Sequence, residues 1–134
     1  MLTEKQLLAM PAEDYMNEAQ VAFFKALLEE KARQIIARLD GEGETLLLQR
    51  QADAADSASS EEAMTLKLSM DQKDRASLLQ VNRALNLIET GDYGYCLETG
   101  EEIGLKRLLL LPESVYTVET MRVIEAKSSH QRAA

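Results

Sequence analysis

The residues with the clearest chemical potential are two aspartates, Asp53 and Asp56, in the small-residue segment 51–58. Carboxylates three positions apart could bind a divalent cation, as in a metal-dependent phosphohydrolase, or pair with basic groups of a partner. They could also be solvated turn residues, with Asp56 capping the helix that follows. Catalysis is disfavoured because no histidine lies nearby and the next carboxylate is Glu61. We therefore expect a protein that is not an enzyme.

Cys96 is the second candidate, and the rest of the sequence limits its chemistry. It is the only cysteine, which excludes an internal disulfide and favours a reducing, cytoplasmic location. The only histidine, His130, lies in the tail, so a catalytic Cys–His pair is disfavoured. One thiolate is also too few for a structural zinc site, which needs four ligands. On its own, Cys96 is best interpreted as a small buried hydrophobic residue.

The composition predicts helices and argues against nucleic acid as a partner. Helix-forming residues dominate the 134-residue chain, aromatic residues are 4% and tryptophan is absent, so a large conventional core is not expected. The net charge is −8, of which residues 1–62 contribute −7. Because binding to DNA phosphates needs a positive surface, we expect no direct DNA binding, whereas a basic protein surface would suit this chain. Neither a signal peptide nor a membrane-spanning stretch is expected.

Two helical stripes flank the acidic segment. Before it, apolar residues recur every three or four positions, and after it a similar pattern resumes. The two stripes are Val21, Phe24, Leu28, Ala32, Ile35, Leu39 and Leu46, and Met64, Leu68, Leu78, Val81, Leu85 and Ile88. Helices of roughly 30–35 residues need a partner for their apolar stripe. We therefore predict an all-α protein with a long antiparallel coiled-coil hairpin over residues 17–90, here called the arm, with its tip at 52–59.

Capping patterns place the ends of the helices. Four patterns predict a short first helix through about Ala9, a second start near residue 17, a restart near residue 59 and a stop at residue 91. They are Thr3-x-x-Gln6, Asn17-x-x-Gln20, Ser59-x-x-Glu62 and Thr90-Gly91. Gly41 and Gly43 interrupt the first stripe, where we expect a bend. The alternative is a true turn at these glycines, which would make a three-helix bundle.

The segment 91–134 differs from the arm. Four glycines and a proline punctuate it, which is typical of a compact, turn-rich unit. We expect a final helix at 120–127, packed beside the N-terminal helix, and a frayed polar tail at 128–134. The predicted globular domain combines the N-terminal segment, 1–16, with this turn-rich unit and the final helix.

Four motifs in order along the chain resemble the DksA/TraR family. They are Tyr15-Met-Asn-Glu-Ala-Gln20, Asp53-x-x-Asp56-x-Ala58, Asp92-Tyr-Gly-Tyr-Cys96 and Gly100-x-Glu102-Ile-Gly104-x-x-Arg107-Leu108. The resemblance covers residues 13–127. It implies a regulator that inserts a coiled-coil arm into the secondary channel of bacterial RNA polymerase and modulates initiation. It also implies that Asp53, Asp56 and Ala58 form the functional tip.

The family's usual zinc finger is altered in this chain. Its four cysteine positions, spaced Cys-x2-Cys-x17-Cys-x2-Cys, fall on Cys96, Thr99, Thr117 and Thr120. Because threonine does not replace a thiolate on Zn²⁺, the chain resembles zinc-independent members of the family, and we expect no metal cofactor. Threonine hydroxyls can instead hydrogen-bond to the backbone. The replacement core would come from Leu108–Leu111, Val115, Tyr116, Val118 and Met121.

The tip pattern occurs twice, since residues 71–76 also have the form Asp-x-x-Asp-x-Ala. The second copy lies within a predicted helix, where Asp71, Asp74 and Arg75 are more simply explained as a solvated face. We prefer 53–58 because it falls at the break between the two stripes.

The resemblance also makes guanosine tetraphosphate (ppGpp) a candidate co-regulator. Of the positions that are basic in relatives, only Lys73 keeps its charge, so Lys106, Arg107 or Arg122 would have to substitute. We expect a monomer. The alternative function is a generic coiled-coil adaptor whose tip aspartates have no special role.

Overall fold

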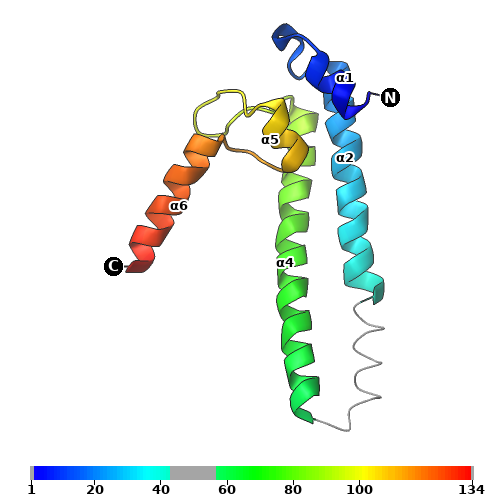
Figure 1. Ribbon diagram of the computed structural model, residues 1–134, viewed down its shortest axis with the longest axis vertical. Coiled ribbons are helices and arrows are strands. Elements are labelled where there is room, and N and C mark those ends of the chain that lie inside the picture. The colour runs from blue at the N-terminus through cyan, green and yellow to red at the C-terminus, as the bar shows by residue number, and fades with distance from the viewer. Residues whose placement is uncertain (1, 43–56, 134) are drawn as a thin grey trace. The chain divides into compact units, whose positions relative to one another are not determined.

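The computed structural model describes residues 2–42 and 57–133, which form helices joined by turns and loops, with no β-strand among them (Figure 1). The helices are α1 (Glu4–Ala9), α2 (Glu18–Ala37), α4 (Ser57–Thr90), α5 (Leu105–Leu110) and α6 (Val118–Ala133), with a 3₁₀ turn at Ala12–Asp14 and a π-helical turn at Arg38–Glu42. The predicted all-α class is confirmed. None of these helices is both long and apolar enough to cross a membrane, within the residues described.

The first two predicted caps are confirmed. In α1, the backbone N–H of Gln6 donates to Thr3 Oγ1 at 3.2 Å, and the backbone N–H of Thr3 donates to Gln6 Oε1 at 3.1 Å. At the start of α2, the backbone N–H of Gln20 donates to Asn17 Oδ1 at 2.9 Å. The side chain of Gln20 then accepts from the backbone N–H of Met16 at 2.9 Å. Each cap satisfies donors that the first helical turn leaves unpaired.

The two ends of α4 differ in how well the sequence predicted them. A helix does restart near residue 59, as predicted, but it begins at Ser57, so Ser59 lies inside the helix and is not its cap. The stop is confirmed: Gly91 has φ of +84°, which glycine adopts without strain. The N–H of Asp92 donates to the carbonyl of Leu87, and that of Gly91 to Ile88, which is a Schellman motif.

The chain divides into two compact units: unit 1 comprises residues 1–28 and 83–134, and unit 2 comprises residues 29–82. In unit 1, α1 packs on α5. Its core joins residues of α1, α2 and α4 to residues of the turn-rich segment. The buried side chains are Leu7, Gln20, Phe24, Leu28, Ala84, Tyr93, Cys96, Ile103, Leu108, Val115 and Thr117.

The expected replacement core for the zinc finger is right in part. Leu108 and Val115 are buried, and they are joined by Tyr93 and Ile103, which the pattern did not single out. Leu110 and Leu111 are exposed, so half of the apolar run 108–111 does not enter the core. The reason is that α5 is a single short helix, which presents only one of its faces to α1.

Two expectations about the C-terminal helix were wrong. It begins at Val118 and continues to Ala133, so the predicted frayed tail is helical through that residue. It also does not pack beside the N-terminal helix: α5 occupies that position, and Figure 1 shows α6 on the far side of α5 from α1. Thr117 starts α6 by accepting the backbone N–H of Thr120 at 3.2 Å, a cap that the capping patterns above do not include.

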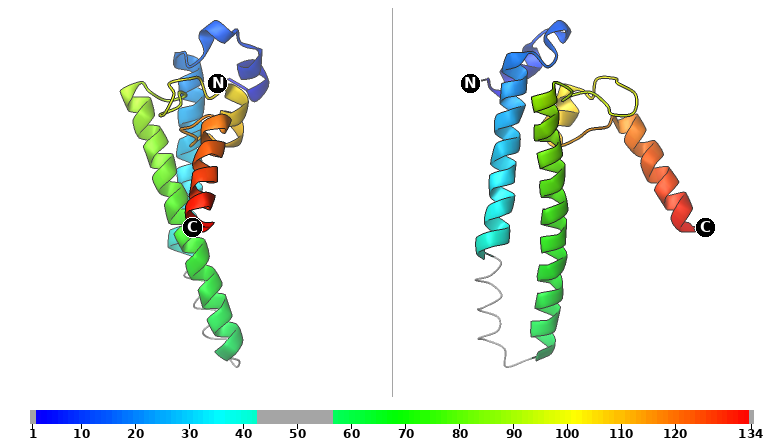
Figure 2. Two further views of the ribbon diagram at one scale, coloured as in Figure 1. Left: turned by 90° about the vertical axis from the view of Figure 1, so that its left-hand side faces the viewer. Right: turned by 180° about the vertical axis from the view of Figure 1, so that it is seen from behind.

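Unit 2 contains the second half of α2 and most of α4, which run antiparallel side by side (Figures 1 and 2). Ala32, Ile35 and Val81 are buried there, as the stripes predict. Met64 and Leu68, however, are 40% and 59% exposed, so the second stripe is wrong in this stretch. At the predicted bend, α2 passes into a π-helical turn that contains Gly41. Gly43 and the choice between bend and turn lie outside the described residues.

Candidate functional site

The predicted tip of the arm is described only at its edge. Asp53 and Asp56 lie outside the described residues, and Ala58 belongs to the first turn of α4. Their role therefore stays a prediction. The site that the structure builds in detail is the group of four former zinc-finger positions in unit 1.

These four residues converge, although they come from two loops and the start of α6. Cys96 Sγ lies 3.4 Å from Thr120 Oγ1 and 4.0 Å from Thr117 Oγ1. The two threonine hydroxyls hydrogen-bond to each other at 3.0 Å. Thr99 accepts the backbone N–H of Glu101 at 3.3 Å, and its hydroxyl also bonds to Cys96. The prediction that threonine hydroxyls would hold the backbone of these loops is confirmed at Thr99 and Thr117.

A tight turn brings Cys96 and Thr99 together. The N–H of Gly100 donates to the carbonyl of Cys96 at 2.8 Å, and the N–H of Cys96 donates to the carbonyl of Glu101 at 2.8 Å. Gly100 closes the turn with φ of +76°, in the region that favours glycine. The N–H of Leu97 then donates to the carbonyl of Val115, which ties this turn to the loop before Thr117.

This group of four residues does not fit a zinc ion. Tetrahedral structural zinc is bound by thiolates and imidazoles, whereas here three of the four groups are hydroxyls that bond to one another or to backbone N–H groups. Across the described ranges 2–42 and 57–133, no group of three or more His, Cys, Asp or Glu side chains is arranged to hold a metal. The geometry is that of a hydrogen-bonded polar core.

The hydroxyl groups change the acidity of Cys96, which is buried as expected. Burial raises the pKa of the thiol, but hydrogen bonds from the Thr120 and Thr99 side chains and from the backbone of Thr117 and Thr99 act in the opposite direction. Together they lower the pKa of Cys96 to about 6, from its usual 9.0. The interpretation of Cys96 as a hydrocarbon-like core residue therefore misses its polar surroundings.

The acidity of Cys96 predicts how stability depends on pH. Because its pKa is lower in the folded than in the unfolded chain, its contribution is full above pH 9 and is lost as the pH falls toward about 6. Hydrogen bonds to a charged group contribute about 1.5–3 kcal/mol, so we expect a loss of that order. Denaturant unfolding at a series of pH values measures it. In Cys96→Ser, whose hydroxyl does not ionise, this pH dependence should disappear. An unchanged dependence would assign it to other groups.

Tyr15 connects the N-terminal segment to the two glycine loops of the turn-rich segment. Its hydroxyl donates to the carbonyl of Gly94 at 2.6 Å and accepts the N–H of Gly104 at 2.9 Å. Its ring contacts Tyr95 edge-on, with centroids 5.7 Å apart. Burial raises the pKa of Tyr15, so the hydroxyl stays protonated and can donate. Tyr15 is part of the first of the four family-like motifs, but the motif alone does not predict these contacts.

Tyr93 plays a similar part inside the core. It is buried, and its hydroxyl donates to the carbonyl of Pro112 at 2.7 Å. Its ring packs against Phe24 of α2, with centroids 5.8 Å apart. A signal for both residues was present, because three of only four tyrosines lie at 15, 93 and 95, beside the loops that they connect.

The four predicted basic contacts have different environments. Lys73, Lys106 and Arg122 are exposed. Arg107 is half-buried, and its Nε donates to the carbonyl of Tyr116 at 3.3 Å, which links α5 to the loop before α6. Arg107 therefore has a structural contact that the sequence did not indicate. A role of these residues toward phosphate stays a prediction.

The second copy of the tip pattern is not a solvated face. Asp74 pairs with Arg38, the first residue of the π-helical turn after α2, through two bonds, to Nε at 3.3 Å and to Nη2 at 3.0 Å. Asp71 accepts the Lys67 ammonium on both oxygens, at 2.8 and 2.9 Å. The Arg38 side chain holds the pKa of Asp74 below its usual value. Both aspartates are thus engaged in ion pairs, which leaves only Arg75 on an exposed face.

Comparison with known proteins finds relatives that match nearly the full length of the chain. Residues 91–119 match the model of the prokaryotic dksA/traR C4-type zinc finger. The RNA polymerase-binding transcription factor DksA of Caulobacter vibrioides is 37% identical over 131 residues, which span 91% of this chain and 84% of that protein. The protein of the same name in Escherichia coli is 31% identical over 121 residues, which span 87% and 79%.

The structural comparison agrees. The structure of transcription factor DksA2 from Pseudomonas aeruginosa superposes with a TM-score of 0.83 at 38% identity, covering 96% of this chain and 100% of that one. The likeness therefore includes the helices of the arm as well as the altered zinc finger. Because identity and coverage are both high, the resemblance of the four motifs is confirmed. The chain belongs to the DksA/TraR family.

Proposed function

We propose that this protein is a transcription regulator that binds RNA polymerase directly, without binding DNA and without catalysing a reaction. The observation that carries the proposal is similarity over nearly the full length to proteins named RNA polymerase-binding transcription factors. The acidic net charge of −8 supports a protein partner over promoter phosphates. The protein acts in the cytoplasm, as a monomer.

The arm is the element that enters the polymerase, by way of its secondary channel, and modulates initiation. In this proposal the tip residues Asp53, Asp56 and Ala58 act near the basic groups and the catalytic magnesium of polymerase. The carboxylates pair with, or displace, charged groups there, and the small alanine permits close approach. A generic coiled-coil adaptor would need none of these residues.

Zinc independence is the second part of the proposal. Two features support it: the poor fit of Cys96 and three threonines to zinc, and the hydrogen bonds of those threonines. The hydroxyl of Tyr15 adds two bonds across the same loops. A structural zinc contributes roughly 10 kcal/mol or more to a small fold, so this network and the core around Leu108 take over that task.

The exposure of the basic side chains bears on the role of ppGpp. Lys106 and Arg122 are exposed and could meet a phosphate, whereas Arg107 already contacts the carbonyl of Tyr116. We therefore propose ppGpp as a co-regulator that strengthens the effect without being required for binding.

The test is transcription in vitro from a ribosomal promoter with purified polymerase, a zinc chelator and a series of ppGpp concentrations. We expect the protein to alter initiation in chelator, and to compete with another secondary-channel factor for core polymerase. Stoichiometric zinc in the purified protein would contradict zinc independence alone. Failure to bind core polymerase would contradict the function and favour the adaptor.

A further inference from the structure

Helix α5 in unit 1 exposes an apolar surface that the fold does not use. Leu108 is buried in the core, whereas Leu110 is 81% exposed and Leu111, which ends the helix, is 44% exposed. A helix of 6 residues with one face against α1 needs no apolar side chain at these two positions. Leu110 and Leu111 therefore contribute little to the stability of the fold, and their contact with water is unfavourable.

The same surface carries positive charge. Lys106 is exposed and lies one helical turn before Leu110, so both side chains share one face of α5. Residues 105–111 contain one further cation, Arg107, and no acidic residue. Because the whole chain has a net charge of −8, this surface is opposite in sign to the rest of the protein. A partner that complements it has acidic groups around an apolar centre.

Hydrogen bonds fix both ends of α5. At its start, the backbone N–H of Gly104 donates to the Tyr15 hydroxyl at 2.9 Å. Directly after its end, Pro112 is buried, and its carbonyl accepts the Tyr93 hydroxyl at 2.7 Å. The exposed side chains are thus presented on a backbone that is already ordered. Such a surface loses little conformational entropy when a partner covers it, which favours binding.

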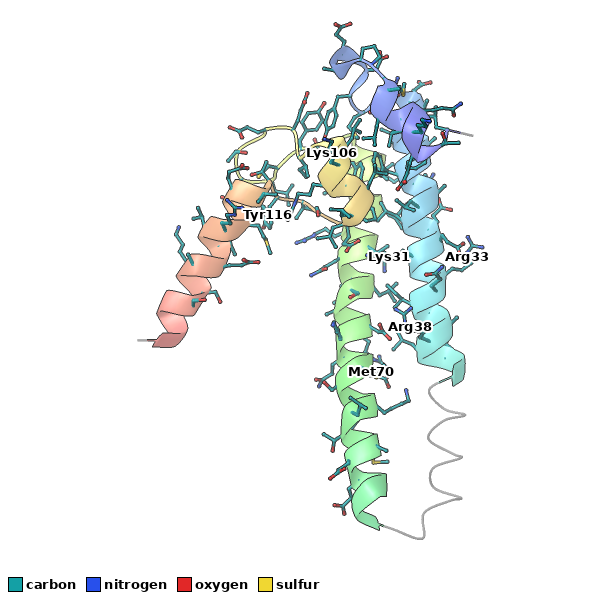
Figure 3. All side chains as sticks on the ribbon, in the orientation of Figure 1. Lys31, Arg33, Arg38, Met70, Lys106 and Tyr116 are labelled. Atoms are coloured by element: carbon teal, nitrogen blue, oxygen red, sulfur yellow. The ribbon has the colours of Figure 1, made fainter. Side chains whose placement is uncertain are left out.

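Charge selects among the possible partners of this surface. Figure 3 shows Lys106 on α5 and Tyr116 beside the start of α6; the carbonyl of Tyr116 accepts from the half-buried Arg107, so Lys106 is the exposed cation of α5. One exposed cation beside two leucines does not suit the phosphates of a nucleotide or of DNA, which several cations bind. A second copy of the chain is disfavoured because two copies of net charge −8 repel each other. An acidic protein surface with an apolar pocket remains.

We propose that Lys106, Leu110 and Leu111, here called the α5 face, dock on an acidic, apolar patch of core RNA polymerase. The inference rests on the proposed function, because it takes polymerase as the partner. Leu110 enters an apolar pocket of that patch, Leu111 covers its edge, and Lys106 pairs with a carboxylate at the rim. The contact is separate from the arm and adds to its affinity, since two linked contacts strengthen each other.

A binding titration of the full chain with core polymerase, at low and high salt, tests the α5 face. Leu110→Ser is expected to weaken binding about ten- to hundredfold, the loss that follows when a leucine side chain is no longer buried. Leu111→Ser should weaken it less. Lys106→Ala should weaken it about two- to fivefold at low salt and not at high salt, because charges at a rim are screened. Since Leu110 is 81% exposed, Leu110→Ser should leave the midpoint of denaturant unfolding unchanged.

Two matched replacements in unit 1 are the controls. Leu97→Ser removes a leucine that is 48% exposed, and Lys5→Ala removes an exposed cation of α1; neither should change the affinity. If Leu110→Ser binds as tightly as the unaltered protein, the proposal is overturned and the proposed function stands, whereas an unaltered protein that does not bind contradicts both. Self-association that Leu110→Ser abolishes, or a ppGpp response that it abolishes at unchanged affinity, would assign the α5 face to another occupant, and either result overturns the proposal.

Discussion

Asparagine at both Asp53 and Asp56 is expected to abolish the effect of the protein on transcription initiation, while its affinity for core polymerase changes by no more than about threefold. Asparagine keeps the size of the side chain and removes its charge. If the tip acts on charged groups near the catalytic magnesium, the charge is what matters, whereas binding rests on the larger surface of the whole protein. Transcription in vitro and a binding titration with core polymerase measure the two effects separately.

The structure improves the choice of control for this experiment. Asp74, in the second copy of the pattern, is unsuitable because it pairs with Arg38, so its replacement changes the arm as well as the charge. Asp40 is exposed in the π-helical turn and lies on the same arm. Asp40→Asn should leave regulation intact. If it reduces regulation as much as the double replacement, net charge and not the tip is responsible.

Gly94→Ala is expected to lower the free energy of unfolding of unit 1 by about 2–4 kcal/mol. Gly94 has φ of +94°, which is strained for any residue with a Cβ atom. The new Cβ would also lie 2.6 Å from Met16 Cγ and 2.7 Å from Met16 Sδ. Met16 cannot readily give way at its backbone, because it already has φ of +57°. Denaturant unfolding measures the loss.

Two further variants divide this loss into its causes. Gly100→Ala has a similar φ of +76° but meets nothing within 4 Å, so it should cost only the backbone strain, about 1–2 kcal/mol. Met16→Ala combined with Gly94→Ala removes the contact. This double variant should therefore lose only about as much unfolding free energy as Gly100→Ala. If Gly100→Ala costs as much as Gly94→Ala, the close approach of Met16 contributes nothing.

Hydrogen bonds around Gly94 hold together the loops that border this polar core. The carbonyl of Gly94 accepts both the Tyr15 hydroxyl and the N–H of Ile103, so one residue joins the N-terminal segment to both glycine loops. Each of these bonds is modest in strength, but a buried group left unpaired is costly. Cys96 and its threonines complete the network on the other side of the same loop. Many hydrogen bonds thus hold the segment that matches the C4-type zinc finger of the family.

Sequence alone determined the features that depend on neighbours along the chain. Thr3 with Gln6, Asn17 with Gln20, and Gly91 all cap helices as predicted, because capping needs only a side chain and the backbone within one turn. The heptad-like stripe of α2 is buried at Phe24, Leu28, Ala32 and Ile35 for a similar reason. The spacing of Cys96 and the three threonines also sufficed, since the family pattern fixes where they meet.

Tertiary structure decided everything that depends on which surfaces oppose each other. Met64 and Leu68 have the right period to be buried, yet the shielded face of α4 carries Asp71 and Asp74, one of which meets Arg38. Leu110 and Leu111 are as apolar as Leu108, but α5 has only one face against α1. Periodicity shows which residues share one face of a helix, but it does not show which element packs against that face. For that reason the polar contact between the helices and the bridge made by Tyr15 appear only once the chain is folded.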